Sequence, residues 1–194
     1  MPTGTHSIAV SFNDCVVDGL VGSSLSGLAT ATYSSSDFQT VSADVSASAL
    51  HAELYAYRSD LYRVTADGSG SITRTRSNDG GSMRLVPIAG ARLTNESTTR
   101  AATFGGGSYT SQYFNPPAGV SAVSRETFDD LMLTIDGTTY VLSGTLQASY
   151  GFTGNQATYV GEVRVTSHGA MVARLFGDNG GALRLEVLRP LVSF

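Results

Sequence analysis

The 194-residue chain has no lysine and no tryptophan, and it has only one cysteine. Charged residues make up 14% of it, against about 25% in an average domain, and all 12 basic residues are arginines. The net charge is −4 and no basic stripe is present, which disfavours nucleic acid as a partner. The apolar content of 41% is high enough for a folded core, so the composition does not indicate a disordered chain.

Further absences exclude several kinds of functional site. Cys15 alone allows neither an internal disulfide nor a zinc site built from cysteines. No run of about 18 apolar residues occurs, so we expect no transmembrane helix. The Gly-x-Ser-x-Gly and His-Glu-x-x-His motifs and phosphate loops are all missing, and the three histidines are scattered. We therefore expect no catalytic residue, no metal and no cofactor, and an enzyme is the less favoured interpretation.

One stretch of the sequence resembles a calcium-binding loop but is incomplete. Asp67, Ser69 and Ser71 have the spacing that opens a calcium-binding loop. The glutamate required at the twelfth position of such a loop is Asn78 here. We interpret these residues as part of a strand connection instead.

The chain contains three short motifs that occur twice in the same order. They are Leu25–Tyr33 and Leu142–Tyr150, Arg63–Gly68 and Arg164–Gly169, and Gly80–Leu85 and Gly180–Leu185. Ordered internal similarity indicates two halves built on one plan. We predict a single domain, 1–194, with homologous halves at about 1–93 and 124–194. A linker, 94–123, joins them. We predict it to be irregular because it contains three consecutive glycines and a Pro-Pro pair.

Alternating apolar and polar residues predict strands throughout. Leu131, Leu133 and Ile135 alternate with polar or flexible residues, and Asp136-Gly137 then predicts a hairpin turn. The motif residues Leu142 to Tyr150 and Leu25 to Tyr33 keep their apolar members on one face, which we expect to point inward. Other strands are predicted at 41–49, 54–65, 72–76, 83–88, 158–166, 171–176 and 183–188. Turns are predicted at 67–68, 79–81, 168–169 and 178–180, where Gly, Asn and Asp tolerate positive φ.

These patterns predict an all-β fold: a duplicated antiparallel meander of about a dozen strands that forms a barrel-like or sandwich domain. A single curved sheet is the third arrangement. Closure or stacking would hide the edge strands, which otherwise invite pairing with another chain.

Six aromatic residues and one arginine, located where the halves differ, are the candidate binding residues. They are Tyr55, Tyr57, Arg58, Tyr62, Tyr109, Tyr113 and Phe114. Tyrosine rings beside arginine form a platform on which sugars or aromatic groups stack. The plain alternative is that these aromatics pack against neighbouring strands or hold their own loop, since sheets are rich in tyrosine.

The stretch Val10–Cys15, followed by Asp18-Gly19 and Leu25-Ser26-Gly27, resembles exported bacterial β-repeat proteins of unassigned function. So does the stretch from Leu131 to Tyr140. The resemblance implies a bacterial envelope or extracellular location, and we expect a signal peptide that is not part of this chain. It carries over no catalytic residue. Such proteins more often have a second cysteine to pair with the one at position 15, and here none exists.

Four functions remain open from the sequence. The first is a non-catalytic exported surface module that binds a glycan or a protein partner. The second is a half-barrel carrier of an apolar ligand, whose cavity would be lined by small residues such as Gly27, Ala29, Ala31 and Ala148. The third is a structural subunit of a surface layer or fibre, which self-associates through edge strands or through 188–194. The fourth is a carbohydrate-active enzyme with a carboxylate pair.

Overall fold

The computed structural model describes residues 4–16, 24–35, 39–55, 61–114, 120–151 and 157–190. All of its regular elements are β-strands. They are β1 (Gly4–Val16), β2 (Ser24–Ser35), β3 (Thr40–Tyr55), β4 (Leu61–Ser77), β5 (Gly80–Val86), β6 (Arg92–Asn95), β7 (Arg100–Phe104), β8 (Ser108–Phe114), β9 (Val120–Ile135), β10 (Thr138–Gly151), β11 (Ala157–Ser167), β12 (Ala170–Gly177) and β13 (Leu183–Val187). The predicted all-β antiparallel meander is confirmed.

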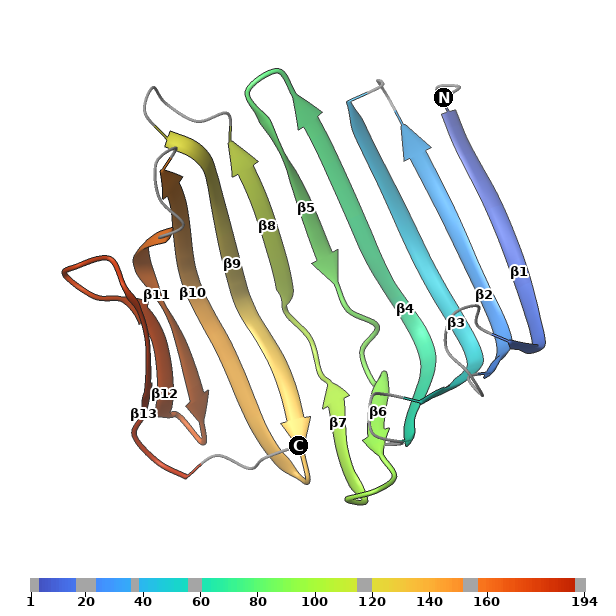
Figure 1. Ribbon diagram of the computed structural model, residues 1–194. Helices are drawn as coiled ribbons and strands as arrows, with labels where there is room; N and C mark the ends of the chain where they lie inside the picture. The colour runs from blue at the N-terminus through green and yellow to red at the C-terminus, as the bar shows by residue number, and fades with distance from the viewer. Residues whose placement is uncertain are drawn as a thin grey trace.

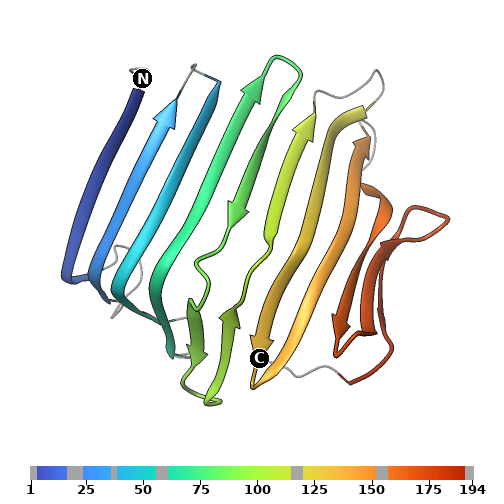
Figure 2. The same ribbon diagram turned by 180° about the vertical axis from the view of Figure 1, so that it is seen from behind.

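The strands form one 13-stranded sheet (Figure 1). Its main order is β1-β2-β3-β4-β5-β8-β9-β10-β11-β12-β13, so sequence neighbours are spatial neighbours except at one place. There, β5 and β8 fill one part of the space between β4 and β9, and the short hairpin β6–β7 fills the other part. Figure 2 shows the same order from behind, with the β6–β7 hairpin at the lower end of the sheet.

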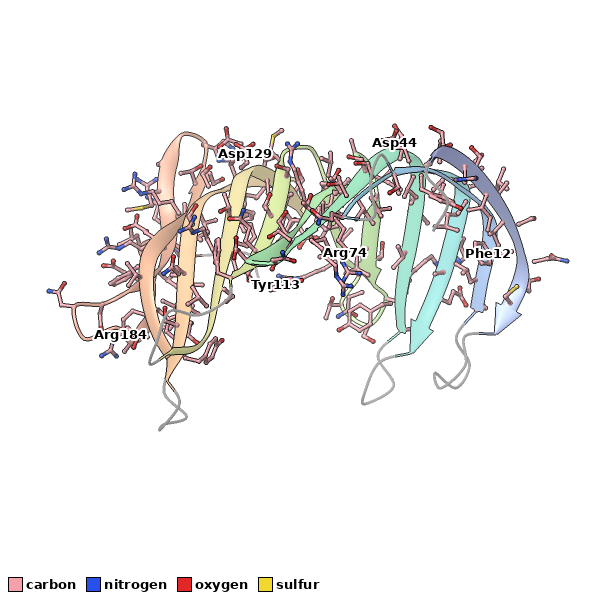
Figure 3. The ribbon with its side chains drawn as sticks, turned by 90° about the horizontal axis from the view of Figure 1, so that it is seen from above. Phe12, Asp44, Arg74, Tyr113, Asp129 and Arg184 are labelled. Atoms are coloured by element: carbon pink, nitrogen blue, oxygen red, sulfur yellow. The ribbon has the colours of Figure 1, made fainter. Side chains whose placement is uncertain are left out.

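The sheet is a single layer that curls part of the way toward a ring. Figure 3 shows both halves bending in the same sense when the sheet is seen from above. Each strand packs chiefly against its hydrogen-bonded neighbours. This partial closure agrees with a barrel-like domain, and within the described residues β1 and β13 are the two ends of the strand order.

The predicted Asp136-Gly137 turn is confirmed. β9 ends at Ile135 and β10 begins at Thr138. Both turn residues have positive φ, 48° and 80°. A two-residue connection with this geometry matches the twist of the strands that it joins.

Two local predictions are wrong. The strand predicted at 54–65 is the end of β3 and the start of β4, because Leu54 pairs with Tyr62 and Tyr55 with Leu61 across a chain reversal. The turn predicted at Asp67-Gly68 lies inside β4. Gly68 has its positive φ of 129° next to a bulge in β3, where the two residues between Ala47 and Leu50 lie opposite the single residue Asp67 of β4.

The linker predicted at 94–123 is more regular than expected. It supplies all of β7 and β8, the end of β6 and the start of β9. Its glycines, Gly105 to Gly107, form the connection from β7 to β8, so they interrupt the strands rather than the sheet. The strands β5 and β6 therefore lie end to end, as do β7 and β8. Each of these pairs of short strands spans a length of the sheet that a single long strand spans elsewhere.

The buried core is small. The buried apolar residues among those described are Ala47, Ala66, Ala102, Tyr140, Leu146, Ala148, Val163, Val172 and Ala173. Alanine is the commonest of them, and most of them lie in the second half of the chain. A single layer buries side chains only between neighbouring strands, so larger side chains stay partly exposed.

Candidate functional site

One face of the sheet carries an apolar row that crosses it from edge to edge. Directly paired residues in antiparallel strands point to the same side of a sheet. The pairs therefore define a row on one face, the inner row, consisting of His6, Tyr33, Ala43, Ile72, Leu85, Tyr109, Phe128, Gly144, Val163, Leu175 and Leu185. Because this row is almost entirely apolar, the face that carries it is an apolar surface.

The adjacent positions form a polar row on the opposite face. This outer row consists of Thr5, Ser34, Ser42, Thr73, Arg84, Thr110, Thr127, Thr145, Glu162, Phe176 and Arg184. Hydroxyls on it pair across strands, as between Thr127 and Thr145 at 3.1 Å. A face of hydroxyl and charged groups is suited to contact with water.

The apolar face lies on the inside of the curl. Figure 3 places Asp44 and Asp129 on the outer side of the bent sheet, and Phe12, Arg74 and Tyr113 on the inner side. Phe12 shares its face with the inner row, since it lies an even number of residues from His6 on β1. The sheet is therefore a half-barrel with an apolar interior.

Large apolar side chains on the inner face remain exposed. Ile8 near one edge is 54% exposed, and Leu185 and Val187 at the other edge are 67% and 52% exposed. The chain has an accessible surface of 11,758 Å². A compact monomer of 20.2 kDa exposes about 8,800 Å². The difference indicates a face that the described residues leave uncovered, and contiguous apolar surface of this kind marks an interaction site.

A pocket of about 230 Å³ opens at the middle of the inner face. It is lined by Leu85, Pro87, Ile88, Ala91, Phe104, Tyr109 and Leu131. The pocket forms where the connection from β5 to β6 passes the connection from β7 to β8. Backbone hydrogen bonds between Gly90 and Phe104 and between Phe104 and Ala91, at 2.7 and 2.9 Å, hold the two connections together. The walls are therefore fixed by the fold.

Few polar groups interrupt the inner face. Glu126 accepts hydrogen bonds from the Tyr109 hydroxyl at 2.5 Å and from the Ser111 hydroxyl at 3.1 Å. Burial, and then the hydrogen bond to Glu126, raises the pKa of Tyr109 above its ordinary value. Tyr109 is also in contact with Phe128, their ring centres being 5.2 Å apart. Tyr109 thus carries a neutral hydroxyl at the border between the pocket and the polar cluster.

Ion pairs gather on the outer face instead. In the first half, Arg63 binds Glu53 and Glu96, each at 3.0 Å, and the hydrogen bond from Arg63 lowers the pKa of Glu53. In the second half, Glu162 binds Arg164 at 2.5 Å and Arg174 at 3.4 Å. The hydrogen bond from Arg164 is the main cause that lowers the pKa of Glu162. These paired charges satisfy one another.

The structure separates the aromatic residues predicted from the sequence. Tyr109 and Tyr113 lie on the inner face of β8, whereas Phe114 lies on the outer face, with the Arg125 guanidinium 5.1 Å from its ring centre. Tyr62 lies on β4 beside Asn95 of β6, in the part of the sheet that β6 and β7 occupy.

The structure does not describe the side chains of three further predicted residues. Tyr55 ends β3, where its backbone alone is described, and Tyr57 and Arg58 lie outside the described residues. A single platform formed by all seven predicted residues therefore stays a prediction.

Sequence reasoning missed the pocket, apart from Tyr109. Pro87 and Ile88 end the strand predicted at 83–88, Ala91 follows it, and Phe104 lies in the predicted linker. These residues come together because β6 and β7 lie between β4 and β9. No local sequence pattern predicts that arrangement. The one available signal was that this connection is apolar, although a solvated loop would be polar.

The described residues contain no group of three or more His, Cys, Asp or Glu side chains placed to hold a metal ion. In the same part of the chain, no helix has the length and hydrophobicity needed to cross a bilayer.

Fold and site together define a class: a single-layer antiparallel half-barrel with an apolar inner face and a hydroxyl-rich outer face. No protein-family model matches the sequence, and comparison with curated proteins and with solved structures finds no match.

Proposed function

We propose that this chain is a non-catalytic binding module that holds an apolar ligand against its inner face. One observation carries the proposal: the inner row is almost entirely apolar, and large apolar side chains on the same face, such as Ile8, Ile72 and Leu185, stay exposed. Covering apolar surface contributes about 25 cal/mol for each Å² removed from water. A ligand that covers this face would therefore be bound by the hydrophobic effect.

The pocket supports the same proposal. Small-molecule sites are concave and mostly apolar, with a small number of placed polar groups. The pocket is formed by apolar side chains and has the Tyr109 hydroxyl at its border. The small residues Gly27, Ala29, Ala31 and Ala148 lie on the same face of the sheet but do not line this pocket.

Filling the pocket tests the proposal. Ala91→Phe places a ring in the pocket, whereas Ala89→Phe changes an exposed residue of the same connection that does not line it. A neutral apolar probe, Nile red, is titrated into each protein and its fluorescence is measured. We expect A91F to weaken binding at least tenfold and A89F to leave it unchanged.

Equal binding by both variants would overturn the proposal, as would no binding by the unaltered protein. Circular dichroism confirms that each variant retains its strands. Sedimentation of the unaltered protein shows whether a second copy covers the inner face instead, which would also contradict a ligand-binding role.

A structural subunit is the second candidate, favoured by the edge strand β1. Among the described strands, β1 pairs only with β2, and it has no charged residue and no proline from Gly4 to Asn13. Natural edge strands are usually blunted by charge, proline or bulges because unpaired N–H and C=O groups recruit other strands. The free edge of β1 is therefore suited to pairing with another chain.

Hydrogen exchange at low and high protein concentration tests the edge. If β1 pairs between copies, its outward amides gain protection as concentration rises, and Ser11→Lys removes that gain. The matched variant Ser143→Lys, on the central strand β10, leaves the concentration dependence unchanged. Exchange independent of concentration would exclude self-association through β1.

An exported location is a further proposal. It is supported by the low charge of the chain and by the hydroxyl-rich outer row. Fractionation of the native source with an antibody against this chain would test it, and recovery in the cytoplasm alone would contradict it.

A further inference from the structure

We propose that the ligand is a single-chain amphiphile with a carboxylate headgroup, a fatty acid, and that Arg74 and Arg76 bind the carboxylate. The inference rests on the proposed function, because it assumes that the inner face holds an apolar ligand. It adds the charge of the ligand and its orientation on the sheet.

Arg74 and Arg76 lie on the inner face, and the cross-strand neighbours of Arg74 carry no charge. Both are on β4, two and four residues beyond Ile72 of the inner row, so all three side chains point to the same side. Figure 3 shows Arg74 on the inner side of the sheet, near Tyr113. Arg74 pairs with Val41 on one side and Met83 on the other, neither of which carries a charge.

These two arginines differ from the others on described strands. Each of the rest has a polar side-chain partner: Arg63, Arg84, Arg92, Arg100, Arg125, Arg164, Arg174 and Arg184. Arg74 and Arg76 are exposed, and within the described residues neither forms an ion pair. Two adjacent guanidinium groups without a carboxylate on an apolar face are a site for an anion, since guanidinium binds carboxylate through two parallel hydrogen bonds.

The nearest acid in the same cross-strand row does not neutralise them. The row runs from Arg74 through Met83 and Ser111 to Glu126, which places Glu126 three strands away, about 14 Å. Glu126 is also already engaged by Tyr109 and Ser111. Among the described residues, no acidic side chain pairs with Arg74, so its guanidinium is available to bind an anionic ligand.

Tyr113 completes the headgroup site. Arg76 pairs with Gly81, and Gly81 pairs with Tyr113. Tyr113 leans over Gly81, because a Cβ on that glycine would lie 2.6 Å from the tyrosine oxygen. The missing side chain of Gly81 lets the Tyr113 ring lie across β5 toward Arg76, where its hydroxyl can donate a third hydrogen bond to a carboxylate.

The position of the pocket determines how the ligand is oriented on the sheet, and its volume determines how many acyl chains the ligand has. Leu85, which lines the pocket, lies one same-face step along β5 from Met83, about 7 Å. A headgroup at Arg74 therefore places the hydrocarbon along the strands and into the pocket. The pocket's 230 Å³ is smaller than the roughly 300 to 1,000 Å³ of drug-sized sites, so it fits one acyl chain better than two.

Calorimetric titration with matched 12-carbon amphiphiles, kept below their micelle concentrations, tests the proposal. The probes are dodecanoate, dodecanol, dodecyltrimethylammonium and monododecyl phosphate. We expect dodecanoate to bind at least tenfold more tightly than dodecanol, and the cation to bind most weakly. The advantage of dodecanoate decreases as salt is added, because the guanidinium groups are exposed.

The double variant R74Q/R76Q is expected to remove the advantage of dodecanoate and to leave dodecanol binding unchanged. R164Q, on the outer face, is the matched control and keeps the advantage. Equal binding of dodecanoate and dodecanol by the unaltered protein would overturn this inference and leave the proposed function intact. Binding of neither would overturn the proposed function itself. A tenfold preference for the phosphate would overturn the assignment of a carboxylate.

Discussion

The hairpins β1–β2 and β9–β10 have the same bulge in very different surroundings. In the first, Phe12 pairs with Gly27, Cys15 pairs with Leu25, and Asp14 has a φ of 48°. In the second, Phe128 pairs with Gly144, Leu131 with Leu142, and Asp130 has a φ of 46°. In each bulge two residues lie opposite one, and the second of the two is an aspartate, which tolerates this conformation.

Their surroundings differ because β1 is at the edge of the sheet and β9 is at its centre. Phe128 has Tyr109 of β8 on its far side, whereas Phe12 has no described strand beyond it. Tyr33 is half-buried and stacked on His6, but its counterpart Tyr150 is 41% exposed, contrary to the expectation that both motif tyrosines point away from water. Local sequence thus determines the bulge, and neighbouring strands determine how much it is buried.

Replacing the bulge glycines is expected to have the largest effect. Gly144 has a φ of 127° and its Cβ would clash with the Glu162 carbonyl, so G144A should destabilise the fold by about 3 kcal/mol. G27A, with a φ of 110° and a carbonyl oxygen of Ala49 2.5 Å from the new Cβ, should cost about 2 kcal/mol, because β3 is nearer the edge and can shift. Urea unfolding measures both. Unchanged stability in G144A would show that the bulge is not needed.

Replacing by alanine the phenylalanine that pairs with each bulge glycine, Phe128 or Phe12, should destabilise the fold less than replacing the glycine. The two losses of stability should also differ from each other. F128A removes a ring that packs on Tyr109 and should cost about 2 kcal/mol, below the 3 to 5 kcal/mol of a fully buried phenylalanine. F12A should cost about 1 kcal/mol, because its strand has a neighbour on one side only. Thermal unfolding of the two variants compares them. Equal losses would mean that the edge and the centre are equally packed.

Acid should weaken both halves slightly, through their outer ion pairs. The pKa values of Glu53 and Glu162 are lowered in the folded state from an ordinary 4.5. Their stabilisation is therefore present above about pH 4.5 and is lost as the pH falls through the lowered folded values. We expect E53Q and E162Q each to reduce the loss of Tm between pH 6 and pH 3. The effect is small because these groups are exposed.

The control for the acid experiment is Glu126→Gln, which changes a carboxyl whose partners are uncharged hydroxyls. A Tm profile that neither E53Q nor E162Q alters would show that the outer ion pairs do not stabilise either half.

The sequence predicted the strands well where alternation and turn residues agreed. Leu131 to Ile135 alternates, Asp136-Gly137 turns, and the structure shows that hairpin. The prediction failed at 54–65, where apolar residues lie on both sides of a chain reversal. It also failed at Asp67-Gly68, where a dipeptide typical of turns lies within β4, opposite a bulge in β3.

The candidate site was predicted only in part. Tyr109 and Tyr113 reach the inner face, but Phe114 reaches the other face, because consecutive strand residues alternate. Arg74 and Arg76 gave no signal in the sequence, since exposed arginines are ordinary. Their significance depends on which face of β4 is apolar. The duplication of the halves stays a prediction: its first motif lies on β2 and β10 and its third on β5 and β13, but its second lies on β4 and β11, out of step by one strand.

By itself, the sequence determined that the chain is all-β and antiparallel, where most strands turn, and which residues of each strand share a face. Those properties depend on neighbours within a few positions, through the period of two and the φ preferences of glycine and aspartate. Only the tertiary structure decided that one face stays uncovered and that β6 and β7 lie end to end with β5 and β8. It also decided that two arginines, which form no ion pair within the described residues, lie near an apolar pocket. These depend on the register between distant strands and on the curvature of the whole sheet, which no short stretch of sequence contains.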